Sequence, residues 1–390
     1  MTVYLDHGAA TPVRASALEA LVGASATSGN PASVHGAGRA ARRLVEDARE
    51  QVAAALGARP AEVVWTSGGT EADNLAVLGL YRAARRTDPT RTRLLVGAIE
   101  HHAVLEPARW LAAYEGAQVT ELPVDGDGVL DVDVLNAELA RGGVAAVSVM
   151  WANNEVGALQ PLDAVVSAAA RHGVPVHADA VQAVGQVPVD LASSGLAAVS
   201  ASGHKVGGPQ GTGALLLRRG VALDAVLHGG GQERGLRPGS VAVAPVVGFA
   251  VAVAEAVGQQ PEQAVRLADL RDDLVTRVLA AVPGARLTGP SDRTRRLPGN
   301  AHLMIEGCRG EDLLLLLDAA GIAASTGSAC QAGVARTSHV LAAMGVDEEH
   351  SGALRLTLGH TSTRADVDAL VRALPAAVAR ARGARRAGAA

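Results

Sequence analysis

One lysine stands out among the residues that could do chemistry. Lys205 is the only lysine in the 390-residue chain, whose other basic residues are arginines apart from twelve histidines. Arginine is effectively never deprotonated, whereas a lysine amine can lose its proton and attack a carbonyl carbon. That attack gives a Schiff base, the linkage of pyridoxal phosphate (PLP) to its enzymes. The alternative is a leftover surface lysine, but the Gly207-Gly208-Pro209 turn that follows favours a reactive side chain presented at a strand end.

Two further side chains suit PLP chemistry. The pyridine nitrogen needs a carboxylate to keep it protonated, and Asp179 could supply one. Alone, Asp179 would be explained better as a helix cap; with the sole lysine downstream, the cofactor role is favoured. His101 could stack on the ring and move protons, because imidazole titrates near neutrality. The His101-His102 pair could instead suggest a metal, but no further spaced ligands accompany it, so no metal site is predicted.

A thiol and a guanidinium complete the candidate set. Cys330 lies in a stretch of small and polar residues, where an exposed thiol can act as a nucleophile. Cys308 follows a predicted strand and is interpreted as structural. Arg355 alternates with leucines along a predicted strand, so it faces away from them. It could bind a carboxylate through two hydrogen bonds, or it could be a solvated strand residue.

The elements that must position these residues alternate between strand and helix. Apolar segments at 93–99, 144–150, 174–177 and 197–200 are separated by helical patterns, which predicts an α/β fold with a largely parallel sheet. Ligands of such sheets bind at the carboxyl ends of the strands. Polar residues follow each of these four strands: His101, Asn154, Asp179 and Lys205.

A glycine-rich turn at 66–71 follows the short strand 63–65 and precedes a helix. Strand, turn and helix N-terminus is a geometry that binds phosphate through backbone N–H groups and the helix dipole. The turn matches neither a P-loop nor a dinucleotide-binding motif. An ordinary turn with Thr70 as the helix N-cap is the alternative.

The second part of the chain predicts a smaller α+β unit. Two long helices are expected at 241–257 and 261–281, with a domain boundary at their junction. The expected large domain covers residues 13–258. The expected small domain covers residues 259–390 together with the N-terminal segment 1–12.

Composition limits the classes of function. A formal net charge of −4 offers no footprint for a polyanion, so direct nucleic-acid binding is not expected. The N-terminus lacks the basic and apolar regions of a signal peptide, and no apolar run predicts a membrane span. Two cysteines argue against a disulfide framework and for the cytoplasm.

Taken together, the motifs resemble a known family. In order, the chain contains Tyr-Leu-Asp, Ser-Gly-Gly-Thr-Glu, Glu-His-His, Asn-Asn-Glu-Val-Gly, His-Ala-Asp-Ala-Val-Gln, Ser-Gly-His-Lys, Gly-Gly-Gly-Gln-Glu-Arg, Gly-Ser-Ala-Cys and Leu-Arg-Leu-Thr-Leu-Gly. This set is similar to PLP-dependent cysteine desulfurases of the NifS/IscS kind, within the class V aminotransferases. The resemblance implies PLP fold type I, an aspartate aminotransferase-like architecture. Its large domain carries a mostly parallel seven-stranded sheet, and its small domain carries the catalytic cysteine loop.

The resemblance also implies roles for individual residues. Lys205 would bind PLP covalently and move the substrate's α-proton, His101 would be the stacking acid/base, and Cys330 would take the sulfur as a persulfide. Arg355 would bind the substrate carboxylate, with Asn154 beside it. The residues implied to contact PLP are Gly69, Thr70, His101, Asn154, Asp179, Gln182, Ser202, His204, Lys205 and Ser240.

Partners follow from the same resemblance. Ser240, in Pro-Gly-Ser where the family has Ser-Gly-Thr, would be donated by the partner subunit, which implies a homodimer. L-cysteine would be the substrate, giving L-alanine. The sulfur would pass to an acceptor such as an iron–sulfur scaffold or a tRNA thiolase in the cytoplasm. A selenocysteine lyase, another class V aminotransferase and a catalytically silent sulfur carrier are the alternatives.

Overall fold

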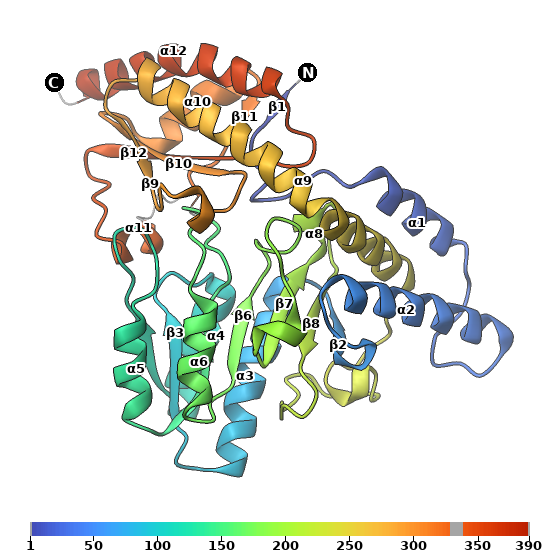
Figure 1. Cartoon of the computed structure of the whole chain (residues 1–390). Helices are drawn as coiled ribbons and strands as arrows, with labels where there is room; N and C mark the ends of the chain where they lie inside the picture. Colours follow the sequence, from blue (N-terminus) through green and yellow to red (C-terminus); the bar gives the residue numbers. More distant parts are fainter. Residues whose placement is uncertain (1, 328–337, 389–390) are drawn as a thin grey trace.

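The computed structural model describes residues 2–327 and 338–388, and it places most of the chain around two sheets (Figure 1). The larger sheet has seven strands in the order β2-β8-β7-β6-β5-β3-β4. Six of these strands run in the same direction, and β8 runs opposite to them. The predicted mostly parallel, seven-stranded sheet is confirmed. Its strands are β2 (Val63–Thr66), β3 (Arg93–Gly97), β4 (Gln118–Leu122), β5 (Val144–Ser148), β6 (Val176–Asp179), β7 (Ala198–Ser202) and β8 (Gly213–Leu217).

Helices bury both faces of this sheet. Successive strand residues point to opposite faces, so each strand contributes side chains to both. In β3, Leu94 and Val96 pack against the helices α3 and α4, while Leu95 joins a second core with α5 and α6. Apolar side chains on both faces are typical of a parallel sheet covered on two sides. The helices are α3 (Gly69–Thr87), α4 (His102–Glu115), α5 (Val132–Ala140) and α6 (Leu162–Ala170).

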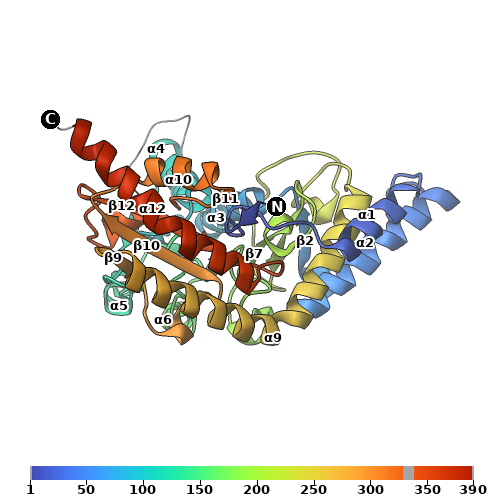
Figure 2. The same cartoon turned by 90° about the horizontal axis from the view of Figure 1, so that it is seen from above.

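The expected pair of long helices is wrong, because residues 243–281 form one helix. This helix, α9 (Val243–Ala281), contains Pro261 in its interior. Its first half packs on α1 (Ala15–Ser25) and α2 (Gly36–Ala55), and its second half on α12 (Arg364–Gly388). Figure 2 shows α9 running along one side of the molecule between these regions. The boundary predicted after residue 258 falls inside α9, so the division into two domains stays a prediction.

Length and composition alone would let α9 cross a membrane. Its buried side chains instead belong to two internal cores. Val246, Phe249 and Val253 pack with the large sheet, whereas Leu274 and Val278 pack with the smaller one. The helix therefore has the packing of a core helix that joins both sheets.

The smaller sheet has three antiparallel strands in the order β12-β10-β9. Leu354 and Leu356 of β12 face the core below α10 and α12, so Arg355 between them faces away, as the alternation predicted. The N-terminal strand β1 pairs with β11, which ties the start of the chain to this region. The bounds are β1 (Val3–Tyr4), β9 (Ala285–Thr288), β10 (Asn300–Glu306), α10 (Gly310–Ala319), β11 (Ile322–Ala323), α11 (His339–Ala343) and β12 (Ser351–Thr357).

Short helical turns complete the fold. Two of them, α7 (Leu191–Ser194) and α8 (Gly203–Val206), flank β7 in the sequence, so α8 begins directly where this strand ends. The 3₁₀ turns are η1 (Pro60–Glu62), η2 (Glu233–Gly235) and η3 (Arg293–Arg295).

Candidate active site

A cavity of about 650 Å³ lies where strand ends of the large sheet face the N-terminal segment and the smaller sheet. It collects nearly all the residues singled out from the sequence. Those that line it are Gly69, Thr70, His101, Asn154, Asp179, Gln182, Ser202, His204, Lys205 and Arg355. Residues more than 280 positions apart in the chain therefore share one site.

Lys205 lies on α8, the single helical turn that follows β7. Its Nζ donates hydrogen bonds to the carbonyl oxygens of Gly8 at 2.5 Å and Ala9 at 3.0 Å. The pKa of Lys205 is lowered from 10.5 to about 8, mainly by burial and also by the nearby Arg355 charge, while Asp179 acts in the opposite direction. The amine can therefore lose its proton near neutral pH, which the surface-lysine alternative would not provide.

Asp179 is the last residue of β6, and its side chain is 6% exposed. Burial raises the pKa of Asp179 to about 6, while the Val181 N–H, bonded to its Oδ1 at 2.8 Å, and the Lys205 charge lower it. The carboxylate therefore stays ionised at neutral pH, although it is enclosed by protein. A buried anion of this kind can hold a proton on a ring nitrogen placed next to it.

Two further buried carboxyl groups near Asp179 were not predicted. Burial, with the Asp179 charge, raises the pKa of Asp73 well above its ordinary value, and burial does the same for Glu100. Among the described residues, Asp73 Oδ1 and Glu100 Oε2 have no hydrogen-bond partner. Burial therefore favours the neutral form of both groups. Sequence periodicity gives no signal for such long-range burial.

His101 follows β3, as predicted, and lies directly before α4. It is the N-cap of α4, and its Nδ1 accepts the Ala103 N–H at 3.1 Å. Its ring is accessible from the cavity, yet the surrounding protein and the Lys205 charge lower its pKa to about 4. The ring is therefore neutral at pH 7, and with Nδ1 accepting, Nε2 carries the proton.

The glycine-rich turn forms another wall of the cavity, at the N-terminus of the 19-residue helix α3. The N-cap is Gly68 and not Thr70, so the expected alternative of a Thr70 cap is wrong. A Cβ on Gly69 would lie only 2.6 Å from Val181 Cγ2, so this close packing requires glycine. Free N–H groups and the helix dipole favour an anion here. Ser202 Oγ and His204 Nδ1, 2.9 Å apart, lie in the same wall.

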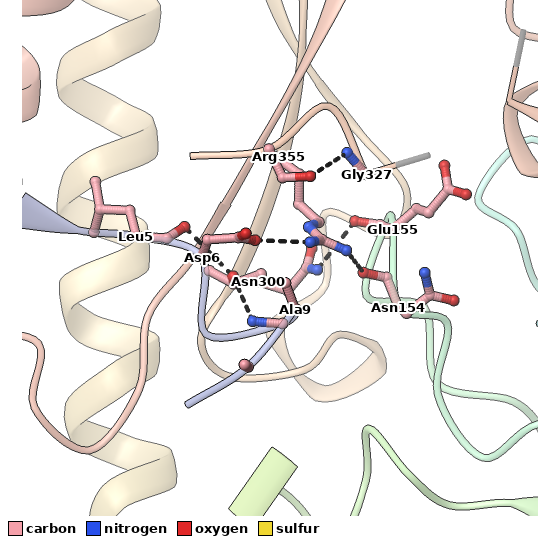
Figure 3. A network of polar contacts seen from close by, with 12 residues as sticks. Leu5, Asp6, Ala9, Asn154, Glu155, Asn300, Gly327 and Arg355 are labelled. Atoms are coloured by element: carbon pink, nitrogen blue, oxygen red, sulfur yellow. Dashed lines mark hydrogen bonds and ion pairs between the residues drawn. The ribbon is translucent and has the colours of Figure 1, made fainter. Parts of the chain in front are cut away.

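Arg355 enters the cavity from β12 and is 4% exposed, which excludes the solvated-strand alternative. Its Nη2 donates to Asp6 Oδ1 at 2.8 Å, and its Nη1 donates to the Asn154 carbonyl at 3.0 Å (Figure 3). Its Nε has no hydrogen-bond partner among the described residues. A buried donor without a partner suits an anionic ligand such as a carboxylate. Asp6 was not predicted as the partner of Arg355, although it belongs to the Tyr-Leu-Asp motif.

The four remaining predictions, for Gln182, Ser240, Cys330 and Cys308, have different outcomes. Gln182 lines the cavity and donates from Nε2 to the Gly8 carbonyl at 2.9 Å. Ser240 is exposed and is not among the residues described as lining the cavity, although Arg237 beside it pairs with Glu71 of the glycine-rich turn at 2.8 Å. Cys330 lies outside the described residues, between Gly327 and Ser338. Cys308 is buried, as expected of a structural cysteine.

The donor set fits PLP. It includes an amine with a lowered pKa, a buried anion for the ring nitrogen, a neutral imidazole and a helix N-terminus for a phosphate. Arg355 places a guanidinium in the cavity wall, where it could bind an amino-acid carboxylate.

Comparisons with known proteins agree with this fit. Residues 3–370 match the family described as Aminotransferase class-V. An IscS-like cysteine desulfurase of Mycobacterium tuberculosis is 54% identical over 381 residues, or 97% of this chain and 97% of that protein. A solved NifS-like protein has a TM-score of 0.89 and 35% identity, covering 97% of this chain and 100% of that one.

A second solved structure, described as SspA in complex with cysteine, has a TM-score of 0.78 and 30% identity. It covers 92% of this chain and 99% of that one. The resemblance and the fold type predicted from the motifs are thereby confirmed. The chain belongs to the class V aminotransferases, a family of PLP enzymes, and within it to the NifS- and IscS-like cysteine desulfurases.

Proposed function

We propose that this enzyme removes sulfur from L-cysteine, giving L-alanine and a persulfide on Cys330, and so acts as a PLP-dependent sulfurtransferase. One observation carries the proposal: the only lysine of the chain shares a cavity with Asp179, His101 and Arg355. The similarity to desulfurases over nearly the whole chain supports the same activity.

The residues proposed to hold PLP would contact different parts of the cofactor. Lys205 would hold the aldehyde carbon, Asp179 the ring nitrogen and His101 the ring face. Asn154 and Gln182 would lie near the ring hydroxyl. Gly69, Thr70, Ser202 and His204 would bind the phosphate, with Ser240 of a second subunit. When bound, PLP supplies the electron sink that stabilises negative charge on the substrate's Cα.

Substrate orientation is assigned to Arg355. Nη1 and Nη2 of the guanidinium donate hydrogen bonds to the Asn154 carbonyl and to Asp6. These two contacts fix the plane of the guanidinium. The guanidinium, which lines the cavity, would bind the substrate carboxylate. We propose that Asn154 contacts the substrate from the same side.

Proton movement at the substrate's Cα is assigned to Lys205. Once freed from the cofactor, its amine would titrate near neutrality, as a general base and acid must at physiological pH. The Gly8 and Ala9 carbonyls would then hold the protonated amine. Neutral His101 is the second proposed acid/base, with its proton on Nε2.

Sulfur transfer is assigned to Cys330. Its thiolate would attack the substrate sulfur, so that a sulfur–sulfur bond forms and the carbon–sulfur bond breaks. The released electron pair stays with the substrate carbon, which takes up a proton, and the amino acid leaves as alanine. Thiolates are suited to this role because they are strong nucleophiles.

We also propose an oligomeric state and a sulfur acceptor for this enzyme. A homodimer would supply Ser240 to each site, and the persulfide sulfur would go to an iron–sulfur scaffold or a tRNA-thiolating enzyme in the cytoplasm. The division into domains 13–258 and 259–390 with 1–12 belongs to the same expectation.

Product analysis tests the activity. Purified enzyme with PLP, L-cysteine and a thiol reductant should release alanine and sulfide in equal amounts without a keto acid. Cys330→Ser should lose this activity while retaining PLP. Formation of a keto acid, or full alanine release by Cys330→Ser, would instead support an aminotransferase or a lyase that needs no nucleophilic cysteine.

A further inference from the structure

Glu155 joins the two flanks of the segment that carries Cys330. On one side, the Ser338 hydroxyl donates to Glu155 Oε2 at 2.6 Å. On the other, Gly327 lies beside Glu155: a Cβ added to this glycine would be in ordinary van der Waals contact, 3.4 Å from Glu155 Cβ and 3.5 Å from Oε2. The Glu155 residue is 3% exposed. Two chain positions separated by the ten residues 328–337 therefore lie beside the same buried side chain, and Ser338 is hydrogen-bonded to it.

The backbone of Glu155 is itself fixed in the turn that follows β5. Its N–H donates to Asn153 Oδ1 at 2.9 Å, and its carbonyl accepts the Asn300 Nδ2 at 3.0 Å (Figure 3). Asn153 is fully buried and is anchored to the Ile99 carbonyl at 3.1 Å. The carboxylate therefore extends from a turn held by the large sheet on one side and by β10 on the other.

Ser338 has a second anchor. Its N–H donates to Glu348 Oε2 at 2.8 Å, while its Oγ also accepts the Leu341 N–H at 3.2 Å as the N-cap of α11. Glu348 and Glu155 thus hold the backbone and the side chain of Ser338 separately. This arrangement fixes the position at which the chain returns from the Cys330 segment.

The other flank is linked to the substrate-binding arginine. Backbone hydrogen bonds join Arg355 and Ser325 in both directions, at 2.6 and 3.2 Å, and Ser325 Oγ accepts the Gly327 N–H at 3.0 Å. The side chain of Arg355 contacts the Asn154 carbonyl, one residue before Glu155. One turn therefore touches the proposed carboxylate site and both flanks of the proposed sulfur acceptor.

We propose that Glu155 is a positioning residue for sulfur transfer, which holds Gly327 and Ser338 so that Cys330 can reach the substrate sulfur. The inference rests on the proposed role of Cys330. Cys330 is only three residues from Gly327, so the position of this flank limits where its thiol can lie. Glu155 does not line the cavity within the described part of the chain, so PLP binding should not depend on it.

The test compares Glu155→Ala with Glu155→Gln in the PLP-loaded enzyme. Glu155→Ala should keep its PLP absorbance and its KM for L-cysteine within about twofold, while the single-turnover rate of persulfide formation falls about ten- to a hundredfold. Glu155→Gln should recover most of this rate, because burial raises the pKa of Glu155 and the amide oxygen can still accept from Ser338. Ser338→Ala removes the same hydrogen bond from the other partner and should also slow persulfide formation.

The double variant Glu155→Ala/Ser338→Ala should be no slower than the worse single variant, since both remove one interaction. A wild-type persulfide rate in Glu155→Ala, or equal losses of PLP and persulfide formation in Glu155→Gln, would overturn the inference. If Glu155→Ala does not fold, the Gln and Ser338→Ala variants still decide it. Absence of a Cys330 persulfide in the wild-type enzyme would instead refute the proposed function itself.

Discussion

The two sides of the cavity are built in different ways. On the side of the large sheet, Asp179 and Lys205 lie at or just beyond the ends of adjacent parallel strands. On the side of the smaller sheet, Arg355 projects from the interior of an antiparallel strand and is held by Asp6 and the Asn154 carbonyl. The first arrangement follows from sheet topology, while the second depends on contacts between segments 349 and 201 residues apart. Cofactor binding and substrate binding should therefore be separable by mutation.

The largest effect is expected at Lys205. Lys205→Ala should lower kcat by at least about a thousandfold, because it removes both the covalent attachment and the acid/base group. Lys205→Arg is the matched control: it keeps the positive charge but cannot lose it, and it should be equally inactive. Steady-state alanine release measures both variants. Turnover of either variant within tenfold of wild type would refute the assigned role.

Asp179 should come next, and Asp73 provides its control. Asp179→Asn replaces the ionised carboxylate by a neutral group of the same shape and should lower kcat about a hundredfold or more. Asp73→Asn should cost only a few-fold, because burial and the Asp179 charge raise the pKa of Asp73 and so favour its neutral form, which an amide resembles. Alanine release by PLP-saturated enzyme measures both variants. Equal losses of kcat in the two variants would mean that the negative charge near the ring nitrogen is not concentrated on Asp179.

Arg355 should affect the substrate and spare the cofactor. Arg355→Lys should raise KM for L-cysteine about ten- to a hundredfold, since a planar, multiple-donor contact is replaced by a point charge. Asp6→Asn should raise KM less, because it removes only one partner that orients the guanidinium. The PLP absorbance of both variants should match wild type. A loss of bound PLP in Arg355→Lys would show that the two sides are not separable.

A smaller effect connects the two sides through charge. In the PLP-free protein, the Lys205 amine should be mostly protonated below pH 8 and mostly free above it, so the rate of PLP capture should rise with pH, with its midpoint near pH 8, and then level off. With an ordinary lysine, the rate of PLP capture would keep rising as the pH approaches its pKa of 10.5. Arg355→Gln should move the midpoint upward, since the Arg355 charge lowers the pKa. A midpoint unchanged by Arg355→Gln would contradict this coupling.

Topology explains what the sequence could predict. His101, Asn154, Asp179 and Lys205 were expected at one edge of the sheet because each follows a predicted parallel strand, and all four line the cavity. Arg355 was expected to face away from its neighbouring leucines because strand residues alternate. These inferences need only local pattern and chain order.

Long-range packing explains what the sequence could not predict. Pro261 suggested a break, but α9 continues because its two halves pack into two cores, which outweighs the local cost of proline. The buried state of Asp73 and Glu100 depends on residues far away in the chain. The Arg355–Asp6 pair and the contact between Glu155 and Ser338 likewise join distant segments.

The most direct test of the central claim is the intact mass of the PLP-loaded enzyme after brief exposure to L-cysteine. The account predicts one added sulfur atom that maps to Cys330, is removed by a thiol reductant and is absent in Cys330→Ser. An unchanged mass in enzyme with bound PLP that still consumes L-cysteine would contradict the account, as would the same added sulfur in Cys330→Ser.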